Sequence, residues 1–84
     1  MFNMHDELKL QILSMLLSGP KRWTALRQSY NPRGLDPKSN TRFNKTLFDL
    51  EADELIGPSL AGGYGITDEG RIRHAELVKR KSHY

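Results

Sequence analysis

Apolar residues in the segment from His5 to Leu17 recur on nearly every side of a helix drawn at about 100° per residue. One side holds Leu8, Ile12, Met15 and Leu16, and the other holds Leu10, Leu13 and Leu17. Only Gln11 and Ser14 form a polar strip, and the pair Gly19-Pro20 ends the helix. A helix that is apolar on nearly all sides is buried on nearly all sides. We therefore expect residues 5–17 to form a central helix packed between the other elements.

A shorter amphipathic pattern occupies residues 22–30, RWTALRQSY. Trp23, Leu26 and Tyr30 are spaced as one helical face, so we expect a short helix in which Trp23 belongs to the core. Asn31 and Pro32 end this helix, and the proline and glycine residues of NPRGLDPKS predict a turn after it.

A third helix is expected to follow this turn. It starts with Asp36 as N-cap and Pro37 in the first helical position, or one turn later at Ser39 or Asn40. Its apolar stripe consists of Phe43, Leu47 and Leu50. The opposite side is polar and partly basic, with Asn44 at the boundary and with Thr41, Arg42, Lys45 and Asp49.

A short β-hairpin comes next. Pro58 prevents a helix from continuing, and Ser59–Ala61 and Tyr64–Ile66 are short strand candidates. Gly62-Gly63 between them is a two-residue hairpin signal.

The last pattern predicts a fourth helix. Thr67 is its expected N-cap, with acidic residues in the first turn, and the helix runs to about Lys81. One apolar face consists of Ile72, Ala75 and Val78. Leu77 and Tyr84 lie on another side without a predicted partner.

The glycines of residues 55–71 do not match a phosphate-binding loop. No Lys or Arg lies between Lys45 and Arg71, so the G-x-x-x-x-G-K-[ST] motif is absent. Asp68 stands where a G-x-G-x-x-G motif starting at Gly63 needs its third glycine, and the pair Asp68-Glu69 would repel a phosphate. We interpret these glycines as turn residues rather than as part of a nucleotide-binding enzyme.

Composition is that of one small globular domain, with 84 residues, 37% of them hydrophobic and 27% charged. The chain has no cysteine, which fits a reducing compartment, and no apolar stretch approaches the roughly 20 residues that span a bilayer. Asp6 and Glu7 stand where a secretion signal would be basic, so we expect a cytoplasmic protein without membrane contact.

No catalytic or metal-binding pattern stands out. His5, His74 and His83 have no metal-ligand spacing, and nothing resembles a nucleophile elbow or a catalytic triad. We therefore expect neither an enzyme nor a protein with a cofactor.

Charge is unevenly distributed along the chain, although the net charge is only +3. Residues 20–50 carry seven basic and two acidic side chains, residues 51–70 carry five acidic and no basic ones, and residues 71–84 carry five basic and one acidic. A basic middle segment is the electrostatic footprint that nucleic acid attracts, although solvated helix faces can show the same charge.

The predicted order of elements indicates a mainly α fold with a small β-hairpin. Helix, helix, turn, helix, hairpin and helix is the order of a winged helix-turn-helix, with a three-helix core, a short wing and a C-terminal helix. Residues 1–84 would form this single domain.

Three stretches support that assignment by their order and spacing: ILSMLLSGPKRWTALRQS, FNKTLFDLEADELI and YGITDEGR. Over roughly Ile12 to Arg71 the chain resembles the winged-helix transcriptional regulators of the HxlR, PadR and MarR type. The resemblance implies a DNA-binding regulator, usually dimeric, in which the helix after the turn reads bases. The turn NPRGLDPKSNTR is longer than the family pattern, and the wing lacks the Arg or Lys that such wings often place against DNA.

The start of the third helix points into the major groove in this fold, which gives a pool of base-contacting residues. They are Ser39, Asn40, Thr41, Arg42, Asn44 and Lys45. Asn suits the paired donor and acceptor of adenine and Arg suits the two acceptors of guanine, so Asn40 and Arg42 are the preferred candidates. The expected phosphate contacts are Lys21, Arg22, Arg27, Arg33, Lys38 and Tyr64.

The expected partner is double-stranded DNA, bound by a homodimer, because one small winged helix covers only one half-site. Candidate dimer contacts are Leu77 and Tyr84, or Phe2 and Met4. The sequence contains no evident binding site for a small-molecule effector. The alternative function is a winged-helix module that binds another protein within a larger assembly. Such a module would tend to show apolar or acidic residues on the exposed face of the third helix.

Overall fold

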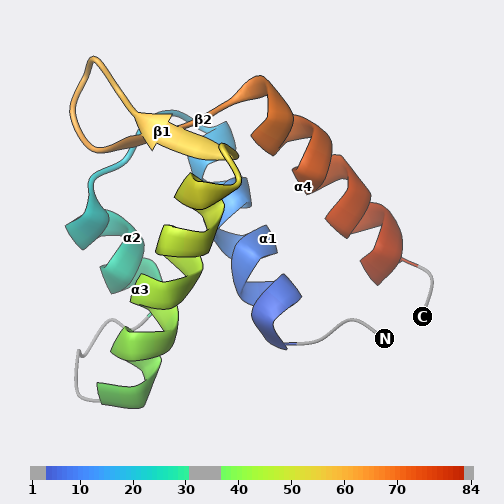
Figure 1. Ribbon diagram of the computed structural model, residues 1–84, viewed down its shortest axis with the longest axis horizontal. Helices are drawn as coiled ribbons and strands as arrows, with labels where there is room; N and C mark the ends of the chain where they lie inside the picture. Colours follow the sequence, from blue (N-terminus) through green and yellow to red (C-terminus); the bar gives the residue numbers. More distant parts are fainter. Residues whose placement is uncertain (1–3, 31–36, 83–84) are drawn as a thin grey trace.

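The computed structural model of the protein describes residues 4–30 and 37–82. Its elements follow the order α1 (Met4–Leu17), α2 (Trp23–Tyr30), α3 (Pro37–Ala52), β1 (Ile56–Pro58), β2 (Tyr64–Ile66) and α4 (Asp68–Lys81) (Figure 1). The prediction of a mainly helical chain with a small antiparallel hairpin is confirmed.

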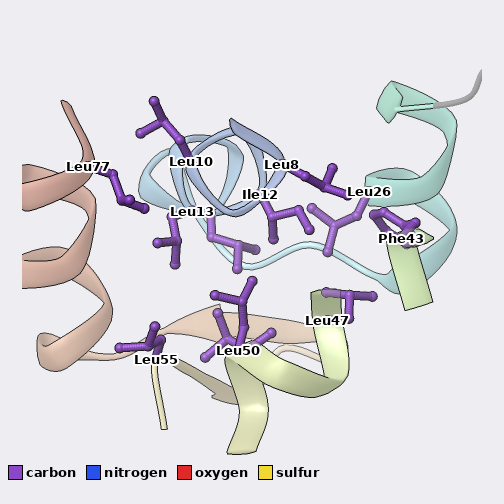
Figure 2. Packing of buried hydrophobic residues seen from close by; sticks show 12 residues of the cluster. Leu8, Leu10, Ile12, Leu13, Leu26, Phe43, Leu47, Leu50, Leu55 and Leu77 are labelled. Atoms are coloured by element: carbon purple, nitrogen blue, oxygen red, sulfur yellow. The ribbon is translucent and has the colours of Figure 1, made fainter. Parts of the chain in front are cut away.

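Helix α1 lies in the middle of the molecule, as its all-round apolar pattern predicts. It contacts α3, α4 and β2, and Figure 1 shows it between the green α3 and the red α4. Figure 2 looks nearly along α1 and shows side chains from the other elements around it. The buried residues of α1 are Leu8, Leu10, Ile12, Leu13 and Leu16. Leu17 is 40% exposed, so the helix is not buried at its last residue.

Helices α2 and α3 close one side of this core. Leu26 is fully buried, and Trp23 packs partly buried against the cluster. On α3 the predicted stripe of Phe43, Leu47 and Leu50 is buried, and Thr46 beside it is buried as well. The Thr46 hydroxyl donates to the Arg42 carbonyl at 2.8 Å, which satisfies its polar atom inside the core. Helix α3 begins at Pro37, in agreement with the first of the two predicted starts.

Parts of these predictions lie outside the described residues. They are the turn residues 31–36, with Asn31, Pro32, Arg33 and the N-cap candidate Asp36. Phe2, His83 and Tyr84 also lie outside them, and the structure does not describe the side chains of Met4, Tyr30 and Ser39.

The first strand of the hairpin lies earlier than predicted. Strand β1 is Ile56–Pro58, not Ser59–Ala61, and it pairs antiparallel with β2 in the register Ile56↔Ile66, Gly57↔Gly65 and Pro58↔Tyr64. Leu55 and Ile56 are buried in the core, and the chain is already extended at Ile56, before it reaches Pro58. A proline is tolerated at a strand end whose N–H is not needed, so Pro58 ends β1 rather than preceding it.

The connection between the strands is therefore longer than the predicted two-residue turn. Residues 59–63 form it, and the Ser59 N–H donates to the Gly63 carbonyl at 3.0 Å. Gly62 and Gly63 both have positive φ, at 93° and 73°, which explains glycine at these positions.

The link between α1 and α2 adds a third extended segment to the hairpin. Lys21 and Tyr64 exchange two backbone hydrogen bonds, at 3.0 and 2.8 Å, so Lys21 forms an isolated antiparallel bridge to β2. A Cβ atom on Gly63 would lie 2.7 Å from the Arg22 Cα, and only glycine allows this close approach. The start of α2 is thereby fixed against the hairpin.

Helix α4 begins as predicted, with Thr67 as N-cap. The Thr67 hydroxyl accepts from the Gly70 N–H at 3.0 Å and donates to the Glu54 carbonyl at 2.6 Å. Asp68 and Glu69 occupy the first turn, where the positive end of the helix dipole favours acidic side chains.

The predicted apolar face of α4 is wrong. Leu77 is 1% exposed and belongs to the core, whereas Ile72 is 54% and Val78 43% exposed. The buried residues of α4 are Gly70 and Leu77, which lie two turns apart on one face. The absence of a side chain at Gly70 lets α4 approach Leu55 and Ile66, and this approach determines which side of α4 faces α1. Leu77 is therefore not available as a dimer contact.

Candidate nucleic-acid interface

The outer face of α3 carries most of the residues predicted to contact bases. Asn40 is half-buried, and four others are exposed: Thr41, Arg42, Asn44 and Lys45. Phe43, Leu47 and Leu50 are three or four residues apart and therefore share one buried helical face. The polar residues fall between these positions in the sequence and lie opposite or beside that face. Lys38 is exposed at the start of the same helix.

Trp23 holds α2 and α3 together at this face. Its ring meets Phe43 edge-on, with centroids 6.2 Å apart and planes at 64°. Its indole N–H donates to the Asn44 Oδ1 at 3.0 Å. Since indole nitrogen only donates, the bond fixes the orientation of the Asn44 amide and directs its amino group away from Trp23. Trp23 thus packs partly buried against the core and also orients a predicted base contact.

Arg27 of α2 lies over the same indole ring. The Arg27 Cζ is 5.3 Å from the ring centroid, within the range of a cation–π contact. The Arg27 Nε is buried and has no hydrogen-bond partner among the described residues. One aromatic side chain therefore positions both Asn44 and Arg27, which come from different helices.

Two further predicted phosphate contacts lie where α2 meets the hairpin. Lys21 is half-buried and Arg22 is exposed, and the backbone bridge to Tyr64 fixes their position. Arg33 lies outside the described residues. Together with Arg27, Lys21 and Arg22 put positive charge on the α2 side of α3.

Tyr64 has an acidic neighbour. Burial raises the pKa of the Tyr64 phenol above its ordinary value, and the charge of Glu51 and a hydrogen bond to it raise the pKa further. The neutral phenol therefore donates to a carboxylate in the groove that Trp23, Glu51 and Pro58 also line. Because Glu51 would repel a phosphate at this point, Tyr64 is the weakest of the predicted phosphate contacts.

Acidic residues bound the basic face at the end of α3. Glu51, Asp53 and Glu54 are exposed there, and Asp68 and Glu69 are exposed in the first turn of α4. A polyanion would meet repulsion on this side of the molecule and attraction at the first three turns of α3 and at α2.

The two histidines in the described part of the chain make single polar contacts. The His5 Nε2 lies 3.5 Å from the Asp49 Oδ2, and the His74 Nε2 lies 2.9 Å from the Ser14 Oγ. Within residues 4–30 and 37–82, no three His, Cys, Asp or Glu side chains form a group that could hold a metal ion. None of the helices described has both the length and the apolar character needed to cross a bilayer.

Phe48 is a surface feature that the sequence patterns did not single out. It is 71% exposed on α3, about 140° around the helix from the buried Phe43. This angle could be read from the sequence, because the stripe of Phe43, Leu47 and Leu50 already defines the buried side. The bond between Trp23 and Asn44 had no such signal, since the two residues are far apart in sequence.

Comparison of the chain with protein-family models, with curated proteins and with solved structures gave no match. The geometry and charge of the described residues are therefore the basis for assigning a function.

Proposed function

We propose that the protein is a sequence-specific, double-stranded DNA-binding regulator of transcription with a winged helix-turn-helix fold. Helix α3 would enter the major groove, and the β1–β2 hairpin would be the wing. One observation carries the proposal: the outer face of α3 presents Arg42, Asn44 and Lys45, whereas its acidic residues lie at the C-terminal end. Hydrogen-bonding side chains of this kind are those that read base edges.

The element order and the contact between the α1–α2 link and the hairpin support the same proposal. In a winged helix, the helix before the recognition helix and the wing flank the DNA-facing surface. Here Lys21 and Arg22 lie beside β2, and Arg27 lies over Trp23 next to Asn44. In this arrangement Asn40 and Arg42 contact bases, and Arg22 and Arg27 hold phosphates.

The alternative, a winged helix that binds a protein, has one observation in its favour, the exposed Phe48. Its neighbours argue against a protein interface. Lys45 and Glu51 lie one turn before and one turn after Phe48, and charged residues are depleted from the centres of protein–protein interfaces.

Base contacts and phosphate contacts should respond differently to truncation. Arg42→Ala is expected to weaken the preferred duplex by about 1–3 kcal/mol and to relax preference at one base position. Arg22→Ala should weaken all duplexes alike and lower the salt dependence of log K by about one. Affinities of each variant for the preferred duplex and for a random-sequence duplex provide the comparison. An equal loss on both duplexes for Arg42→Ala would make Arg42 a phosphate contact and remove it from base reading.

We further propose a homodimer whose contact surface is the exposed face of α4, which does not include the buried Leu77. Ile72, Ala75 and Val78 are exposed and share a face of α4, and the helix has acidic residues in its first turn and basic residues in its last. Two copies packed antiparallel would place Ile72 opposite Val78 of the other copy. The face is therefore self-complementary, as a two-fold interface requires.

Sedimentation at micromolar concentration tests this interface. The unaltered protein should sediment as a dimer, and Ile72→Asp should shift it to a monomer because a carboxylate would be buried against Val78. Leu60→Asp is the matched control, because Leu60 is fully exposed in the hairpin turn, away from α4. A clean monomer in the absence of DNA, with one protomer on each bound site, would contradict the proposal.

A further inference from the structure

We propose that Phe48 reads thymine in the major groove through contact with its 5-methyl group. This inference rests on the proposed function and adds a specificity-determining residue to it. Phe48 is 71% exposed although it is one of the largest apolar side chains in the chain. The core beneath α3 does not need it, since Phe43, Leu47 and Leu50 fill that side.

Phe48 lies on the part of α3 that would enter the groove. At about 100° per residue, Thr41, Lys45 and Phe48 fall within roughly 60° of one another, opposite the buried stripe. Thr41 and Phe48 are seven positions apart, a rise of about 10 Å along the helix, or about three base-pair steps. A helix lying in the groove with Thr41 and Lys45 against the bases therefore brings Phe48 against them too.

The chemistry of the side chain limits what it can recognise. A phenyl ring has no hydrogen-bond donor and no conventional acceptor, so it cannot read the polar groups of guanine, cytosine or adenine. The 5-methyl group of thymine is the one apolar group on the major-groove edges, and apolar side chains contact it. Asp49 and Glu51 are acidic and follow Phe48 within one turn, so Phe48 lies at the limit of the part of α3 that a polyanion would approach.

The test removes the methyl group from the DNA and leaves the protein unchanged. In the preferred duplex each dT is replaced singly by deoxyuridine, which keeps the base pair and lacks only the methyl group. Burial of one methyl corresponds to roughly a three- to fivefold change in affinity. We expect one position in each half-site at which deoxyuridine weakens binding of the unaltered protein by this factor.

Phe48→Ala should bind the dT and deoxyuridine duplexes equally at that position. Leu17→Ala is the control, because it truncates another partly exposed apolar side chain, at the end of α1 and outside α3 and the hairpin, and should keep the full deoxyuridine effect. Thermal unfolding of Phe48→Ala, expected to match the unaltered protein, verifies that the exposed substitution leaves the fold intact.

Two results would overturn the inference while leaving the proposed function standing. One is specific DNA binding by the unaltered protein with no deoxyuridine effect at any position. The other is a deoxyuridine effect that Phe48→Ala retains in full, which would assign the methyl contact to another residue. Failure to bind any duplex would instead remove the proposed function, and the inference with it.

Discussion

Raising the salt concentration from about 50 to 200 mM should weaken binding of the dimer to duplex DNA by roughly a thousandfold or more. Each protomer presents Lys21, Arg22, Arg27 and Lys45 at or beside the proposed interface. If three or four basic residues of each protomer meet phosphates, log K against log salt has a slope of roughly −5 to −7. Fluorescence anisotropy of a labelled duplex, titrated at several salt concentrations, measures this slope.

Lys81→Gln provides the control for the salt experiment. The Lys81 Nζ lies 2.9 Å from the Glu7 Oε1 at the C-terminal end of α4, so this charge is already paired and lies outside the proposed interface. Its removal should leave the slope unchanged, whereas Arg22→Ala lowers it by about one. An affinity that stays flat between these salt concentrations is incompatible with phosphate contacts by these residues.

Gly70→Ala should destabilise the fold by about 2–3 kcal/mol, equivalent to a fall in the unfolding midpoint of about 10–20 °C. At an unobstructed helical position the same change would stabilise the protein, because alanine has the higher helix propensity. Here an added Cβ would collide with the Leu55 carbonyl oxygen and lie 2.7 Å from the Ile66 Cγ1. The Leu55 carbonyl also accepts from the Thr67 N–H at 3.0 Å, so it cannot move without losing that bond.

Gly57→Ala is the matched control for this substitution. Gly57 lies in β1, has no positive φ, and an added Cβ would meet nothing within 4 Å. Its unfolding midpoint should change by little, since no neighbour obstructs the new methyl group. Equal stability of both variants and the unaltered protein would mean that α4 does not lie against Leu55 as described.

Local patterns predicted much of this fold because they depend on neighbouring residues. The all-round apolar character of α1, the stripe on α3 and the cap at Thr67 each follow from a few positions along the chain, and the structure has all three. The sequence patterns placed the first strand too late, after Pro58, because a proline suggested the end of a helix there. The burial of Leu55 and Ile56, which decides the position of β1, depends on distant parts of the core.

The buried side of α4 could not be judged from its own sequence. Ile72, Ala75 and Val78 form the more apolar stripe, yet Leu77 faces the core because Gly70 allows a close approach to Leu55. At the candidate interface, residue type and helical angle predicted the exposure of Thr41, Arg42 and Lys45, but Asn40 and Asp49 are half-buried and the exposed Phe48 was not singled out. The contacts of Trp23 with Asn44 and Arg27 join two helices, and no spacing within either helix encodes them.

The most direct test of the proposed function is selection of bound duplexes from a random-sequence pool. Because Asn40 and Arg42 are proposed to contact bases from α3, the recovered duplexes should share one motif. A homodimer should recover it as two inverted copies about one helical turn apart. Recovery of a motif whose preference Arg42→Ala relaxes at one position is the result we predict. Recovery of a pool no different from the input, at low salt, would contradict the assignment of this protein as a sequence-specific DNA-binding regulator.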